Sequence, residues 1–245
     1  MSKNILVVGA GNPDKFGQHF VKKTREEGNR VIVFSHKNHN TSNVDDRHIN
    51  YNDTAQVKNK CVELSNELPV IDIILFNQVG SGYPDNPTQF FNEPNVDEYN
   101  KSIAGAVVIP HLIIASLYNN LVVGSKVVYM GSTMALEYER EHYVSGVGYP
   151  SGKSFAMHLI SSMARCRTKE VTFSSMCPYF LYDQPELYKQ TFEQTYNYIL
   201  THDDSMNGKL VHQFNGFENP YVPGKINYAK QYETWVASTQ SNLEL

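Results

Sequence analysis

The stretch KNILVVGAGNPDKFGQHF, residues 3–20, puts a short apolar strand, a glycine-rich turn and the start of a helix in immediate succession. Its run NILVVGA is typical of a strand, and the mixed polar and apolar residues from about 17 to 27 are typical of a helix that covers it. If this unit repeats along the chain, it builds a parallel sheet with helices on both sides.

The rest of the chain does repeat the unit. Five further apolar runs read as strands: RVIVFS (30–35), VIDIILFNQ (70–78), SKVVYMGS (125–132), EVTFSSM (170–176) and GKLVHQF (208–214). Two of them are continuous enough to be buried on both faces. Residues 96–120 have helical periodicity, which Pro110 would kink or divide, and a further helix is expected at about 150–165. We therefore predict a Rossmann-type α/β fold, a doubly wound, mostly parallel sheet of about seven strands with helices on both faces.

Composition limits the class of protein. A chain of 245 residues suits one domain, 1–245, around a single core. Its net charge of −4, without a basic run, does not indicate a binding surface for nucleic acid or an anionic membrane. Cys61, Cys166 and Cys177 lack the spacing of a disulfide framework or a zinc site, and we expect no metal. With no signal-peptide pattern and no apolar run long enough for a bilayer, a cytoplasmic protein is expected.

Ligands of such a sheet bind at the carboxyl ends of its strands. After the first strand, Gly9, Gly11 and Gly17 precede a helix, and such a turn suits a pyrophosphate because the helix N-terminus favours its charge. The spacing departs from G-x-G-x-x-G, so a purely structural turn is the alternative.

The second strand ends in Ser35, His36 and Lys37, where an NAD site usually has an acid. A hydroxyl beside basic groups suits a 2′-phosphate, so NADP is favoured over NAD, which stays possible. An ordinary solvated loop is the other interpretation.

A third group joins the end of the strand SKVVYMGS to the following helix. Ser132 ends the strand, Tyr149 follows 17 residues later, and Lys153 lies four beyond it. A tyrosine has a reference pKa of about 10, which a nearby ammonium lowers, making the phenol a usable acid or base. A hydroxyl from Ser132 would bind the same substrate oxygen. Pro150 predicts Tyr149 at the helix cap, with Lys153 one turn along. By spacing alone a surface pair would be the better interpretation.

Together these motifs resemble the short-chain dehydrogenase/reductase family, from about residue 4 to 217. The segments that carry the resemblance, in order, are VVGAGNPDKFG (7–17), FNQVG (76–80), YMGS (129–132), YPSGK (149–153), CPYF (177–180) and GKLVHQFNGF (208–217). Each is loose alone, but their order is specific.

The resemblance implies roles for individual residues. Ser132 would orient the substrate, Tyr149 would be the acid or base, and Lys153 would hold the nicotinamide ribose and tune Tyr149. Ser102 stands where the family has a helix asparagine that supports a proton relay. The implied cofactor-binding set is Gly9, Gly11, Phe16, Gly17, Ser35, His36, Lys37, Asn50, Asn77, Gly80, Lys153 and Pro178.

Some positions depart from the family pattern. Asn50 replaces the usual Asp near the adenine, and Tyr179 replaces the glycine after Pro178. The loop 134–148 is longer than usual and rich in carboxylates, which would suit a cationic substrate group or be merely solvated. Ser102, Asn50 and Tyr179 motivate a second hypothesis, a catalytically weakened cofactor-binding sensor or partner subunit.

The remaining expectations concern the substrate side and assembly. The aromatic-rich segment at about 179–207 matches the family's substrate-covering segment, although core packing explains its aromatic residues equally well. A C-terminal arm at about 218–245 would pack on a neighbouring subunit or be disordered. The helices at 97–120 and 150–165 resemble the family's dimer-forming pair, so we expect a homodimer or homotetramer. The predicted function is NADP(H)-dependent interconversion of a small-molecule carbonyl and alcohol.

Overall fold

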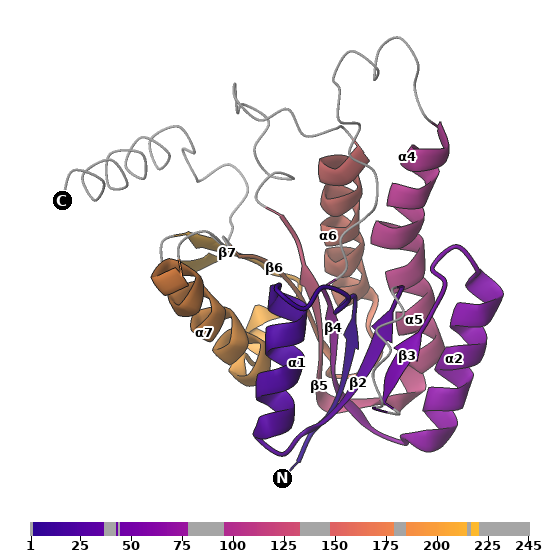
Figure 1. The fold of residues 1–245 in the computed structure, drawn as a ribbon, viewed down its shortest axis with the longest axis horizontal. Helices are drawn as coiled ribbons and strands as arrows, with labels where there is room; N and C mark the ends of the chain where they lie inside the picture. Colours follow the sequence, from indigo (N-terminus) through magenta and orange to yellow (C-terminus); the bar gives the residue numbers. More distant parts are fainter. Residues whose placement is uncertain are drawn as a thin grey trace.

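The computed structural model describes residues 2–36, 43, 45–77, 96–132, 148–178, 185–214 and 217–220, which form one sheet with helices on both sides (Figure 1). The strands are β1 (Asn4–Val8), β2 (Arg30–Ser35), β3 (Asp46–His48), β4 (Ile71–Phe76), β5 (Leu121–Met130), β6 (Thr172–Cys177), β7 (Leu210–Phe214) and β8 (Phe217–Pro220). The helices are α1 (Phe16–Glu26), α2 (Thr54–Glu67), α4 (Val96–Ile103), α5 (Ile109–Leu117), α6 (Gly148–Cys166) and α7 (Pro185–Thr201). Short helical turns are η1 (Ala104–Val108), η2 (Tyr118–Asn120) and η4 (Asp204–Met206).

The sheet has the order β3-β2-β1-β4-β5-β6-β7-β8. Every pair from β3 to β7 is parallel, and β8 alone runs antiparallel to its neighbour. The predicted α/β doubly wound fold is confirmed, with eight described strands where about seven were expected. The extra strand begins the segment that we expected to be an arm. Only two residues separate β7 from β8, too few for a parallel crossover, so the returning strand is antiparallel.

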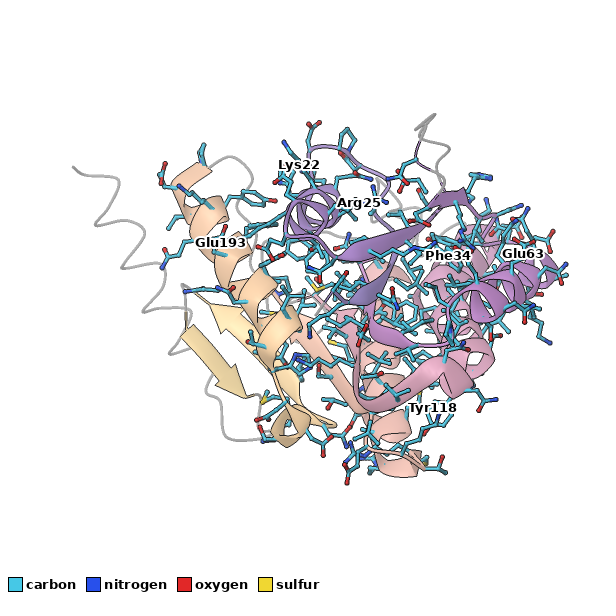
Figure 2. The ribbon with its side chains drawn as sticks, turned by 90° about the horizontal axis from the view of Figure 1, so that it is seen from below. Lys22, Arg25, Phe34, Glu63, Tyr118 and Glu193 are labelled. Carbon is cyan, nitrogen blue, oxygen red and sulfur yellow. The ribbon has the colours of Figure 1, made fainter. Side chains whose placement is uncertain are left out.

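Two apolar cores lie on opposite faces of the sheet. Along β1, Ile5 and Val7 point to one face and Leu6 and Val8 to the other, because successive side chains of a strand alternate. α1 and α7 cover the first face, and α2, α5 and α6 cover the second. Figure 2 shows this from below, with Phe34 in the interior and Glu63 on the outer side of α2. The burial of both faces explains why the strand sequences are almost continuously apolar.

The helix expected at 96–120 is continuous through Pro110, but it contains a π turn. Residues Ala104–Val108 form this turn, in which Ile109 N–H donates to the Ala104 carbonyl, and Pro110 lies in the first turn of α5. Proline has no N–H for the carbonyl four residues earlier, which is that of Ala106. The expected interruption at Pro110 therefore takes the form of a wider helical turn directly before it.

α6 begins earlier than we expected. Its first residue is Gly148, so Tyr149 lies in the first helical turn and Pro150 follows it, at a position where the missing N–H removes no intrahelical bond. The helix thus begins two residues before the predicted start at Pro150, and Tyr149 is its second residue, not its cap. As a result, Tyr149 and Lys153 are a true i, i+4 pair on one helix face. No helix within the described ranges is both long and apolar enough to cross a bilayer.

Candidate active site

The strand order reverses between β1 and β4, and the predicted cofactor residues Gly9, Gly11 and Asn77 follow the carboxyl ends of these two strands. From β1 the chain proceeds to β2 and β3 on one side, while β4, β5 and β6 follow on the other. A sheet of this kind binds its ligands at such a switch point. In Figure 1 the same edge of the sheet receives the N-terminal ends of α1 and α6.

The turn from β1 to α1 depends on two glycines and one asparagine. Gly9 has a φ of 92°, a conformation that residues with a Cβ rarely adopt, and its N–H donates to the Phe34 carbonyl over 2.8 Å. A Cβ on Gly17 would lie 3.0 Å from Ala10 Cα and closer still to Asn77 Nδ2. Asn77 Nδ2 donates to the Gly9 carbonyl over 3.0 Å. Asn77, a predicted cofactor residue, therefore stabilises the backbone of the glycine turn through this hydrogen bond.

The start of α1 offers backbone N–H groups without a competing acid. The first turn of α1 contains no acidic residue, and its N-cap Lys15 forms no side-chain cap bond. Phe16 has a side chain only 1% exposed, packed on Phe20 and Phe192 at centroid distances of 5.8 and 5.5 Å. A cofactor contact of Phe16 would consequently come from its backbone, since its ring belongs to the core.

At the end of β2 the two described residues of the predicted set differ in exposure. Ser35 is buried, on the same face as Val33. His36 is exposed and stacks on Tyr51, with centroids 5.6 Å apart and an interplanar angle of 24°. His48 Nε2 donates to the His36 carbonyl over 3.0 Å. Lys37 lies outside the described residues.

Asn50 forms a turn that leads into α2. Its Oδ1 accepts from Asn52 N–H over 3.0 Å, and its own N–H donates to Gln56 Oε1 over 2.6 Å. The Tyr51 phenol donates to the Phe34 carbonyl over 3.0 Å, and burial raises the pKa of this phenol. Sequence reasoning missed Tyr51 and His48, although the segment HINYN puts both directly beside Asn50.

The end of β5 and the start of α6 bring the predicted catalytic residues to one place. Ser132 follows the last residue of β5 by two positions, and Tyr149 lies in the first turn of α6, both half-buried. Lys153 is 2% exposed, and its Nζ donates to the Met130 carbonyl over 2.7 Å. The same Nζ lies 5.9 Å from the ring centroid of Tyr149. The lysine therefore joins the helix that carries Tyr149 to the strand that leads to Ser132.

Burial controls the charge of this lysine. Loss of water around Lys153 lowers its pKa to about 7, and the neighbouring Cys177 thiol offsets a small part of that shift. Tyr129, which sequence reasoning missed, presents its ring 4.8 Å from Lys153 Nζ. The contacts of the ammonium include one carbonyl and two aromatic faces, and near neutral pH it is poised between its charged and neutral forms.

Gly131, directly after β5, lies close to side chains of α6 and β6. A Cβ on Gly131 would lie 2.5 Å from Met157 Sδ and 2.7 Å from Cys177 Sγ, and the Cys177 thiol already donates to that Met157 sulfur over 3.5 Å. The Gly131 N–H donates to the Met176 carbonyl over 2.7 Å. This close packing explains why the residue before Ser132 has no side chain.

The remaining predicted residues are only partly described. Pro178 is half-buried directly after β6, and Ser102 lies in α4, two residues before the π turn. The helices α4 and α6 contact each other. Gly80, Tyr179, the loop residues 134–147, the start of the substrate-covering segment and the chain after 220 lie outside the described residues.

Comparison with known proteins supports the fold. No protein-family model matches the sequence, and no curated protein matches it. Solved structures do match, and those compared below have low sequence identity. A short-chain dehydrogenase/reductase family oxidoreductase from Brucella ovis, in complex with a partially ordered NAD, has a TM-score of 0.70 and 17% identity, covering 87% of this chain and 100% of that one.

Two further structures agree with it. A short chain dehydrogenase from Leptospira borgpetersenii with bound NAD+ has a TM-score of 0.71 and 14% identity, over 89% of this chain and 93% of that one. Aldohexose dehydrogenase from Thermoplasma acidophilum, free of ligand, has a TM-score of 0.69 and 13% identity, over 88% and 93%. At this level of identity the likeness establishes a shared fold.

Proposed function

We propose that the chain is an oxidoreductase of the short-chain dehydrogenase/reductase family, which interconverts a carbonyl and an alcohol with NADP(H). The observation that supports this most directly is the buried Lys153, held beneath the end of β5 one helical turn from Tyr149. Structural pairs on a helix surface do not bury an ammonium in this way. The fold shared with dehydrogenases, two of them with NAD bound, supports the cofactor class.

The described residues at the switch point fit a nicotinamide dinucleotide. Gly9 and Gly11 present no side chains, and α1 begins beside them without an acid in its first turn. The pyrophosphate would lie at this turn, against the helix N-terminus. The exposed His36, with no acid at the end of β2, supports a 2′-phosphate and hence NADP over NAD.

Each catalytic residue has a distinct task in this proposal. The bound nicotinamide would supply hydride to the carbonyl carbon in reduction, or accept it in oxidation. Tyr149 would donate its phenolic proton to the carbonyl oxygen in reduction and take it back in oxidation. Ser132 would donate a hydrogen bond to that oxygen. The Lys153 ammonium would favour the phenolate form of Tyr149 and bind the nicotinamide ribose.

A cofactor titration followed by a substrate panel tests the proposal. NADPH and NADH are titrated against the purified protein by fluorescence, and a panel of carbonyl compounds is then followed by loss of NADPH absorbance. We expect NADPH binding and turnover of at least one compound. Tyr149→Phe should reduce turnover by at least about a thousandfold while leaving cofactor affinity nearly intact.

A matched variant makes this test specific. Tyr118→Phe removes a phenol whose partner is Thr168, at the opposite end of β5, and it should keep parental activity. Equal activity of Tyr149→Phe and the parent would remove Tyr149 from the mechanism. If the protein binds cofactor but neither form turns over any compound, the sensor hypothesis is favoured. If neither cofactor binds, the proposal is wrong.

The protein is also proposed to be cytoplasmic and homo-oligomeric. None of its three cysteines forms a disulfide bond, which is usual in a reducing compartment. Phe155 of α6 is 59% exposed and Val108 of the adjoining η1 is 44% exposed. Large exposed apolar side chains on neighbouring helices fit an interface with a second copy.

A further inference from the structure

Tyr129 connects three parts of the site that the sequence keeps far apart. It lies on β5, fully buried, on the face covered by α5 and α6. Its phenol donates to the Ala106 carbonyl over 3.3 Å, its ring lies 4.8 Å from Lys153 Nζ, and its ring centroid is 6.4 Å from that of Phe76.

The carbonyl of Ala106, four residues before Pro110, accepts from the Tyr129 phenol. In a regular helix the N–H at position 110 would donate to the Ala106 carbonyl, and proline has none. Ala106 is buried, so water cannot easily replace that donor. The Tyr129 phenol, which comes from the sheet, is a donor to this carbonyl. π turns in otherwise regular helices frequently accompany functional sites, and here the turn is tied to the strand beneath it.

The phenol of Tyr129 is fitted to this donor role and not to proton exchange. Burial raises its pKa, and the neighbouring Tyr149 and Cys177 raise it further. The group thus stays protonated near neutral pH and continues to donate to Ala106.

The ring of Tyr129 acts on the Lys153 ammonium. A cation above an aromatic face is stabilised by the negative face of the ring, and this interaction strengthens where water is absent. Lys153 is 2% exposed, so the ring replaces part of its lost hydration. Met130, the residue after Tyr129, contributes the carbonyl that accepts from Nζ. One short segment of β5 thus provides two of the contacts that keep the ammonium charged and in place.

We infer that Tyr129 is a positioning residue for the carbonyl/alcohol chemistry, whose ring holds the Lys153 ammonium beneath Tyr149 and whose hydroxyl fixes that ring to the π turn. The inference rests on the proposed function. It makes the irregular helix part of the site, since the chain of contacts runs from Ala106 in the π turn through Tyr129 to Lys153.

Graded fluorination of the ring separates this role from simple core packing. Fluorine withdraws charge from the face of a ring with little change of shape. The protein is prepared with Tyr129→Phe, and with di- and trifluorophenylalanine in place of Tyr129. The Lys153 pKa is measured without cofactor by NMR of labelled lysine, assigned with Lys153→Arg. We expect the pKa to fall stepwise with fluorination, by about half a unit to one unit in total.

Phe76 supplies the matched control. Its ring contacts Tyr129 in the same core, and fluorination of Phe76 should leave the Lys153 titration unchanged. The pH profile of kcat should be bell-shaped, with one limb that depends on Lys153. This limb should move to lower pH with increasing fluorination at position 129, in the same order as the pKa values measured by NMR. Tyr129→Phe alone keeps the ring but loses the phenol, and it should speed amide hydrogen exchange around the π turn.

The outcomes distinguish this role from the proposed function itself. If the parent turns over NADPH and fluorination at position 129 moves neither the Lys153 pKa nor the pH profile, the positioning role is wrong while the enzyme proposal stands. If the parent neither binds cofactor nor turns over any carbonyl, both are wrong. A stepwise shift in an active protein, absent from the Phe76 series, supports the role.

Discussion

At the end of β5 a lysine ammonium lies among aromatic rings and a carbonyl, with little water around it. Its pKa of about 7 means that the protein carries this charge only below or near neutral pH when no ligand is bound. An anionic dinucleotide prefers the charged form. Cofactor binding should therefore take up a proton whenever the solution is more basic than this value.

The first prediction at this scale concerns cofactor affinity. Because Lys153 loses its proton above pH 7, the Kd for NADPH should rise with pH between about 7 and 9, by at most about tenfold per unit. Titrations at several pH values measure this. Lys153→Arg keeps a permanent charge and should flatten the dependence. An equally steep slope in that variant would assign the effect to another group.

Gly17 offers a second test at the level of one atom. Gly17→Ala forces a Cβ against Ala10 Cα and the Asn77 amide, so we expect a loss of about 1–3 kcal/mol in the free energy of unfolding and weaker cofactor binding. Urea denaturation measures it. Adding Asn77→Ala removes one of the clashing groups, so the double variant should lose less than the sum of the single losses. Strict additivity would contradict the packing argument.

At the level of the elements, a neutral histidine, His202, links the end of α7 to β6. His202 Nδ1 donates to the Tyr198 carbonyl over 2.7 Å, Nε2 accepts from the Ser174 hydroxyl over 3.3 Å, and the ring stacks on Tyr198 at 4.5 Å. Burial lowers the pKa of His202 to about 4. The histidine therefore remains neutral in the folded protein at pH values where it is protonated in the unfolded chain.

This predicts acid sensitivity of the α7 end. The folded pKa is depressed below 6.5, so stability is lost as pH falls from 6.5 to 4, by roughly 3 kcal/mol for a shift of about 2.5 units. Urea denaturation at pH 6.5, 5 and 4 measures the slope. His202→Asn keeps a donor but does not titrate, and its stability should depend less on pH in this window. An unchanged slope would attribute the acid sensitivity to the carboxylates.

The sequence predicts best the geometry that depends on linear spacing, and it misses what depends on tertiary contact. The glycine turn and the Tyr149–Lys153 pair depend on neighbours in the chain, and the structure brings both to the same sheet edge. The burial of Ser35 follows from counting by two from the buried Val33, because alternate residues of a strand share a face. Tyr129 was missed because its partner Ala106 lies 23 residues away on a helix whose irregularity no local pattern reveals.

For the whole molecule, assembly is the property to test. Phe155→Glu puts a charge on the exposed face of α6, and we expect it to dissociate a homodimer or homotetramer into monomers at micromolar concentration. Light scattering after size exclusion measures the mass. Val62→Glu changes a similarly exposed side chain, 57% accessible, on α2, and it should leave the mass unchanged. A parent protein that is monomeric would contradict the prediction.

The two outer strands of the sheet have a consequence for solution behaviour. In the part of the chain that the structure describes, β3 has three residues and β8 has four, so each of these two outer strands presents only a short row of amides and carbonyls. A strand from another molecule needs a longer row of unpaired backbone groups to add to the sheet. Such short outer strands disfavour edge-to-edge polymerisation and amyloid-like growth. The long apolar strands lie inside the sheet, where they cannot pair with another chain.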